Sequence, residues 1–131
     1  MKKNAKYVLI AGAMLAFLGV ALGAFGAHAL KARLAPDLLA VYQTGVQYHL
    51  IHALGIVLLG VVVQLLPTSK LLSAAAWLMV AGVLVFSGSL YVLSVTGLRF
   101  FGAITPFGGL ALLAAWLLFA IGVAKSAAES S

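Results

Sequence analysis

The sequence contains no cysteine and very few charged residues. Disulfides, cysteine-ligated zinc, iron–sulfur clusters and thiol nucleophiles are therefore excluded. Only 8% of the 131 residues are charged, whereas a typical globular protein has roughly 25%. Hydrophobic residues make up 65% of the chain, and the mean hydropathy is +1.21. This composition predicts one domain whose surrounding solvent is largely lipid.

Acidic residues are the scarcest charged class, with two against eight lysines and arginines. The basic residues occur singly or in a short N-terminal cluster, and no stripe of them could follow a phosphate backbone, so we expect no nucleic-acid partner. Neither acid lies in an apolar run. We therefore expect no carboxylate proton relay, no cation-exchanging acid of the small multidrug transporter type and no Ser-His-Asp triad within the membrane.

Four apolar runs are each close to the ~20 residues that a helix needs to cross a bilayer. They cover residues 7–27, 48–66, 71–95 and 103–123. Backbone amides in lipid must bond within the protein, so the spans are helices or a closed barrel, and these runs lack the alternation of barrel strands. The sequence predicts an all-α integral membrane four-helix bundle that forms a single domain over residues 1–131.

The connections between the runs carry start signals for helices. Pro36 with Asp37 suits a helix start, and Thr105 with Pro106 predicts the start of the fourth helix. Between the first two spans, leucines alternate with charges, which predicts a short amphipathic segment in the interface. Its residues are Leu30, Lys31, Arg33, Leu34, Asp37, Leu38 and Leu39.

Lysines and arginines near the helix ends predict the orientation, because the cytoplasmic side carries their excess. One face has five of them, Lys2, Lys3, Lys6, Lys70 and Lys125, and the other has three, Lys31, Arg33 and Arg99. We therefore expect both termini in the cytoplasm of a bacterial inner membrane. The first run covers 21 residues, longer than the roughly 7 to 15 of a signal peptide core, and is expected to stay as a span.

Small residues recur every three or four positions on two of the runs. Such stripes let helix backbones approach closely, and we assign them to helix packing. The sequence leaves open whether the packing is within one chain or between two copies. The stripes are Gly12, Ala16, Gly19, Gly23 and Gly26 in the first run and Gly108, Ala111, Ala115 and Gly122 in the fourth, with Gly60 in the second.

Polar side chains are predicted to converge in the outer leaflet, at the ends of the spans opposite the termini. Histidines are the side chains here that titrate near neutrality, and ionisable groups at membrane depth are functional candidates. They could pack the bundle by hydrogen bonds, contact a lipid headgroup or quinone, or ligate a metal or haem iron. We predict no catalytic residue, metal or cofactor. The candidate cluster is His28, His49, His52, Ser87, Tyr91, Ser94 and Thr105.

Four motifs in order resemble the YgdD-like family, also described as transmembrane protein 256-like or domain of unknown function 423. They are LGAFGAH at 22–28, YQTGVQYH at 42–49, FSGSLY at 86–91 and TPFGG at 105–109. The resemblance implies a small bacterial inner-membrane protein of four spans with no settled activity. It supplies no catalytic or cofactor residues.

These features together predict a non-enzymatic membrane protein that contacts lipid headgroups or a partner protein through the polar cluster. Membrane lipids are the expected partners, with a homo-oligomer or another membrane protein as further options. One alternative is a histidine-based metal or haem protein. Another is a small transporter built by oligomerisation.

Overall fold

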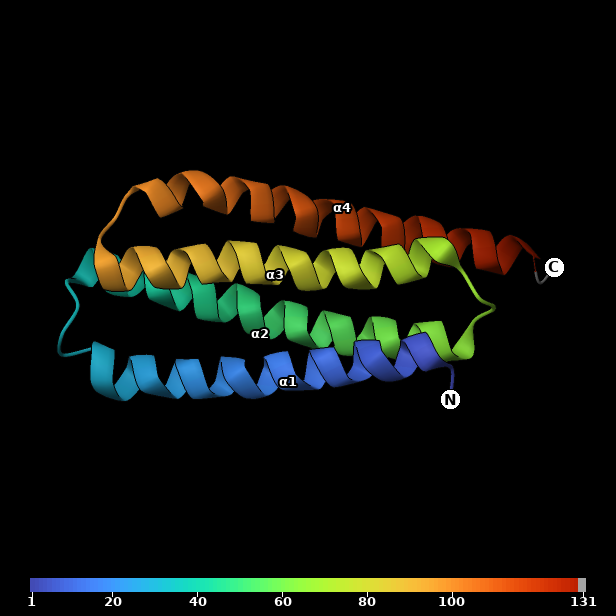
Figure 1. The fold of residues 1–131 in the computed structure, drawn as a ribbon, viewed down its shortest axis with the longest axis horizontal. Helices are drawn as coiled ribbons and strands as arrows, with labels where there is room; N and C mark the ends of the chain where they lie inside the picture. Colours follow the sequence, from blue (N-terminus) through green and yellow to red (C-terminus); the bar gives the residue numbers. More distant parts are fainter. Residues whose placement is uncertain (130–131) are drawn as a thin grey trace.

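The computed structural model describes residues 1–129. It contains four long helices and one π-helical turn, and this part of the chain has no strand (Figure 1). All four helices are long and apolar enough to cross a membrane. The prediction of an all-α membrane helical bundle is confirmed. The elements are α1 (Lys3–Phe25), η1 (Gly26–Leu30), α2 (Pro36–Leu65), α3 (Lys70–Thr96) and α4 (Phe100–Glu129).

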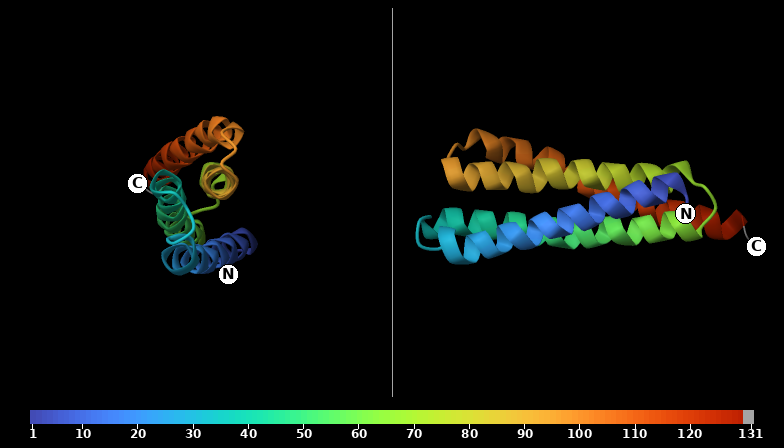
Figure 2. Two further views of the ribbon diagram at one scale, coloured as in Figure 1. Left: turned by 90° about the vertical axis from the view of Figure 1, so that its left-hand side faces the viewer. Right: turned by 60° about the horizontal axis from the view of Figure 1, so that its bottom comes forward.

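The helices pack in chain order as an open row. α1 packs on α2, α2 on α3 and α3 on α4, and the end-on view places α1 and α4 at opposite ends of the row (Figure 2). In the most apolar 18-residue window of each helix, 44% of residues are buried in α2 and 39% in α3, but 22% in α1 and in α4. The inner two helices therefore supply most of the core, and the outer two present most of their surface to lipid.

The helix ends follow local sequence signals. α2 starts at Pro36 with Asp37 in its first turn, as predicted. The Ser69 side chain caps α3 by accepting a hydrogen bond from the backbone amide of Leu72 at 3.4 Å. Gly97 ends α3 in the left-handed conformation, with φ of 71°, which glycine adopts without strain.

Two helices extend beyond their apolar runs toward the end of the molecule that carries the α1–α2 and α3–α4 connections, called the loop end here, and the start predicted for the fourth helix at Thr105 is wrong. α2 begins at Pro36, whereas the apolar run begins at Tyr48, so Leu38 and Leu39 of the predicted interfacial segment are helical. α4 begins at Phe100 and Pro106 lies inside it. Membrane helices tolerate proline because neighbouring groups satisfy the carbonyls it leaves unbonded. The carbonyl that lacks its usual amide donor here is that of Gly102, while the neighbouring Thr105 hydroxyl bonds back to the carbonyl of Phe101 at 3.1 Å.

A π-helical turn joins α1 to the first connection. The backbone amide of Lys31 donates to the carbonyl of Gly26 at 3.0 Å, one residue further back than in an α-helix. A Cβ at Gly26 would collide with the Tyr42 ring of α2, so glycine is needed there. The turn therefore lets α1 end directly against α2.

The glycine stripes are used for packing within this chain. An added Cβ at Gly12 would lie 2.9 Å from the backbone nitrogen of Val57, and one at Gly60 would lie 3.2 Å from that of Leu9. Gly19 and Gly23, the G-x-x-x-G pair, face Leu50 and Val46 of α2, and Gly108 of α4 lies against the backbone of Phe86. The α1 stripe therefore faces α2 of the same chain.

Polar side chains tie the start of α1 to its neighbours at the end of the molecule that carries both termini, called the terminal end here (Figure 1). The Lys2 ammonium group donates to the carbonyls of Val63 and Leu66, which satisfies the end of α2. The Asn4 amide donates to the Ser73 hydroxyl at 2.8 Å and accepts from the Trp77 indole at 3.0 Å. These contacts fix the relative positions of the first three helices.

Candidate functional site

His49 lies on α2 and forms hydrogen bonds to both neighbouring helices. Its Nε2 atom is 2.7 Å from the carbonyl oxygen of Leu15 in α1, and its Nδ1 atom is 2.8 Å from the Tyr91 hydroxyl in α3. A carbonyl only accepts, so Nε2 carries the proton and, in the neutral ring, Nδ1 accepts from Tyr91. The side chain is 4% exposed. One imidazole therefore links three helices.

Further polar contacts surround this histidine. The Tyr42 hydroxyl donates to the carbonyl of Leu22, and the Tyr42 ring packs against that of Tyr91 with centroids 5.2 Å apart. The Ser87 hydroxyl donates to the carbonyl of Gly45 at 2.8 Å. In the described part of the chain, every buried side-chain nitrogen and oxygen has a hydrogen-bond partner. We call His49, Tyr91, Tyr42 and Ser87 the His49 network; its geometry favours a role in packing.

His52 lies one turn further along α2 and faces α4. The Trp116 indole N–H donates to its Nε2 at 3.0 Å, and its Nδ1 lies 2.7 Å from the carbonyl of Tyr48. An N–H donor and a carbonyl acceptor fix the neutral ring with the proton on Nδ1. A metal ion or a proton at Nε2 would have to displace Trp116.

His28 does not join the other histidines, which corrects the expectation that all three converge. It lies on η1 and is exposed. It is nine residues beyond Gly19, which faces His49, a separation of about 13 Å along a helix. Within residues 1–129, no group of three His, Cys, Asp or Glu side chains is placed to hold a metal. The three-histidine site is not formed.

The remaining members of the predicted cluster are also divided. The Ser89 and Thr105 hydroxyls are 2.6 Å apart and join α3 to α4. Ser94 is buried and bonds back to the carbonyl of Tyr91 at 2.9 Å. The structure thus brings Tyr91 and Ser87 to the side of α2 that holds His49, and leaves Thr105 at a separate contact.

The two α2 histidines lie nearer the middle of their helix than the apolar run predicts. The apolar run begins at Tyr48, which predicts His49 and His52 near the first turn of the second span, but α2 has 30 residues and both lie in its middle. His52 is 16 residues from Pro36, about 24 Å of helix. Trp116 is likewise 16 residues from the start of α4 at Phe100. The bonds of His49 and His52 therefore lie near the middle of these helices.

An apolar cavity of about 490 Å³, called the lateral groove here, lies between α2 and α4 with α3 behind it. Its walls are aromatic: the Tyr48 and Phe86 rings have centroids 4.6 Å apart, and Tyr48 stacks on His52 at 5.9 Å. The His52–Trp116 bond crosses it between α2 and α4. It is lined by Tyr48, His52, Phe86, Pro106, Gly109, Leu110, Leu112, Leu113 and Trp116.

A second cavity, of about 460 Å³, lies at the loop end and carries charge. We call it the loop-end pocket; it is lined by Asp37, Leu38, Leu93, Gly97, Arg99 and Gly102. Phe86, Leu93 and Gly97 fall within about 40° of one another on α3, at 100° per residue. The loop-end pocket therefore follows the lateral groove along the same face of α3.

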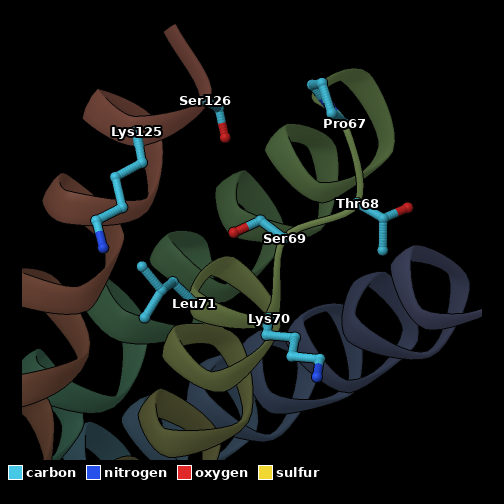
Figure 3. Close-up of a pocket in the computed structure, with 7 residues that line it drawn as sticks. All are labelled: Pro67, Thr68, Ser69, Lys70, Leu71, Lys125 and Ser126. Atoms are coloured by element: carbon cyan, nitrogen blue, oxygen red, sulfur yellow. The ribbon is translucent and has the colours of Figure 1, made fainter. Parts of the chain in front are cut away.

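A smaller cavity of about 230 Å³ lies at the terminal end, beside the start of α3 (Figure 3). Lys70 and Lys125 border it, and both are exposed. Their side chains extend on different sides of the α3 start and do not converge (Figure 3). We assign no ligand to this cavity.

Two residues of these contacts were not predicted as site residues. Tyr42 shares a helix face with His49, so its spacing on α2 could have marked it. Trp116 lies at mid-helix in an apolar run, and an indole N–H in such a run needs an acceptor because lipid offers none. That requirement was the available signal for the bond to His52.

Comparison with known proteins gives the family. The family model described as "Protein of unknown function (DUF423)" matches residues 22–109, more than half of the chain. The chain belongs to the DUF423 family. The matched segment contains the His49 network, the lateral groove as far as Gly109 and the loop-end pocket. The family resemblance predicted from the four motifs is confirmed.

Relatives in the DUF423 family align with almost the whole chain. The UPF0382 membrane protein YwdK of Bacillus subtilis is 45% identical over 120 residues, covering 92% of this chain and 98% of its own length. The UPF0382 inner membrane protein YgdD of Escherichia coli is 36% identical over 122 residues, covering 93% and 92%. No solved structure matches this chain. The relatives are membrane proteins by name, and those names state no activity.

Proposed function

We propose that this protein is a non-enzymatic lipid-binding protein of the bacterial inner membrane, and that the lateral groove holds one acyl chain of a phospholipid. The observation that carries the proposal is an apolar cavity of about 490 Å³ between two spanning helices. His52 in its wall has both ring nitrogens bonded, so it offers packing surface and no free proton acceptor. Such a cavity suits a hydrocarbon chain.

The combined length of the lateral groove and the loop-end pocket supports a single lipid as the occupant. The loop-end pocket begins at Gly102 and the lateral groove extends to Trp116, fourteen residues later, which is about 21 Å along a helix. One leaflet with its headgroups is about 20 to 22 Å thick. The two cavities together therefore extend from headgroup depth to about the bilayer centre.

The charge distribution supports the outer leaflet as the source of the lipid. Five of the eight lysines and arginines belong to the terminal end, and the cytoplasmic side carries the basic excess. With both termini in the cytoplasm, the loop end faces outward. The polar contact with lipid that the sequence suggested is then made at Asp37 and Arg99, while the histidines lie deeper.

Photo-crosslinking can test the proposal. The protein would be reconstituted in nanodiscs with a phospholipid that carries a diazirine midway along its acyl chain, and labelled residues would be mapped by mass spectrometry. We expect labelling to concentrate on Tyr48, Leu110 and Leu113. The substitution Gly109→Leu should reduce it about tenfold, or about 1.4 kcal/mol of binding. An added Cβ at Gly109 comes no closer than 3.7 Å to another atom, so the variant should fold.

Gly88→Leu is the matched control. An added Cβ at Gly88 meets no atom within 4 Å, and Gly88 lies on the other side of the molecule, in a cleft of about 170 Å³ beside His49. This variant should retain labelling of the groove. Equal labelling of Gly109→Leu and the unmodified protein, or labelling spread evenly over the lipid-facing side of α1, would contradict the proposal.

A further inference from the structure

The loop-end pocket brings together two opposite charges from different helices. Asp37 lies in the first turn of α2, and Arg99 directly precedes α4. Both line the same cavity of about 460 Å³, and in the described part of the chain no ion pair joins them. Lys31 and Arg33 lie on the preceding turn and do not line this pocket. One acid and one base thus border a space large enough for a polar group.

Pro106 removes one backbone hydrogen-bond donor next to this pocket. In a regular helix the carbonyl of Gly102 would accept from the amide of residue 106, but Pro106 has no amide hydrogen. Gly102 lines the pocket with Asp37. A carboxylate and a backbone carbonyl are acceptors, and together they suit a group with several N–H donors. The guanidinium of Arg99 suits a phosphate, which it can hold through two parallel hydrogen bonds.

We propose that the loop-end pocket selects an aminophospholipid, with the phosphate on Arg99 and the primary ammonium group on Asp37 and the carbonyl of Gly102. The inference rests on the proposed function, because the acyl chain of the same lipid occupies the lateral groove. A lipid such as phosphatidylethanolamine carries both charges in one headgroup. Phosphatidylglycerol has the phosphate but no ammonium group, so it leaves Asp37 uncompensated beside an anion.

Competition between the two lipids tests this selectivity. The protein would be equilibrated in vesicles with equal amounts of phosphatidylethanolamine and phosphatidylglycerol, then extracted, and the bound lipid identified by native mass spectrometry. We expect about ten times more bound phosphatidylethanolamine than bound phosphatidylglycerol, and Asp37→Asn to remove this preference, a change of about 1.4 kcal/mol. Arg99→Gln should lower the retention of both lipids.

The paired substitution of Lys31→Gln with Arg33→Gln is the matched control, because it removes charge at the same end but outside the pocket. It should leave the preference unchanged. If Asp37→Asn keeps the preference while Gly109→Leu still loses the bound lipid, the headgroup inference is wrong and the proposed function stands. If no lipid is retained and crosslinking finds none in the groove, the proposed function itself fails.

Discussion

The two histidines of α2 lie three residues apart and have different surroundings. His49 lies between α1 and α3 and makes both of its hydrogen bonds to other helices. His52 faces an open groove and makes one bond to α4 and one within α2. Three residues rotate a helix by about 300°, so the rings point about 60° apart. The open row of helices turns this small rotation into a difference between a closed interface and a cavity.

The largest expected effect comes from adding a methyl group at glycines where two neighbouring helix backbones lie in close contact. Gly108→Ala should lower the free energy of unfolding by about 3 kcal/mol or more, because the added methyl group meets the backbone of Phe86. Gly12→Ala, which meets the backbone of Val57, should have the same sign. Thermal unfolding in detergent would measure both variants.

Gly88→Ala is the control for this pair, since it adds the same methyl group where nothing lies within 4 Å. It should be neutral, or stabilising by up to about 1 kcal/mol from improved helix propensity. If all three variants unfold at one temperature, the glycines are not the basis of the close packing.

An intermediate effect should separate the two histidines. His49→Phe removes two bonds between helices and should reduce stability by about 1–3 kcal/mol. His52→Phe removes one such bond and should have about half that effect. Unfolding by SDS, followed by circular dichroism, would compare them.

Tyr91→Phe, combined with His49→Phe in a double-mutant cycle, isolates the bond between these two side chains. We expect a coupling of about 0.6 kcal/mol, and at most about 1.7 kcal/mol, which are the mean and the maximum for such bonds in membranes. A coupling near zero would show that His49 acts only by filling space.

The smallest effect is expected at His28. It is exposed, so His28→Ala should change the unfolding free energy by less than about 0.5 kcal/mol. The same variant should leave zinc content and the visible spectrum of the purified protein unchanged. A stoichiometric metal or a haem absorption band that disappears with His28→Ala would revive the three-histidine alternative.

Much of the fold could be predicted from hydropathy, because four runs of the right length have few arrangements in a bilayer. Pro36 and Asp37 also marked the start of α2 correctly. The depth of His49 and His52 could not be read from the runs, since residues 36–47 are polar enough to lower hydropathy while remaining helical. The start of α4 could not be predicted from Pro106 either, because a proline that suits a helix start is also tolerated inside a membrane helix.

The candidate site was harder to predict than the fold. Spacing placed His49, Tyr91 and Ser87 near one another, and the structure brings them to one side of α2. The spacing of these residues gave no information on which helices pack against each other. The row separates α1 from α4, and this separation places His28 apart from the groove and leaves α2 facing Trp116 across it. Such a cavity arises from helix arrangement, which a single sequence does not specify.

Packing in chain order also has a consequence for biosynthesis. Each helix finds its main neighbour in the one made just before it, so a nascent chain entering the bilayer one hairpin at a time has a docking surface ready at every step. Short sequence separations between partners favour rapid assembly. The bond between Trp116 and His52 is a late event by this logic, since its donor lies on α4, which follows the other three helices along the chain.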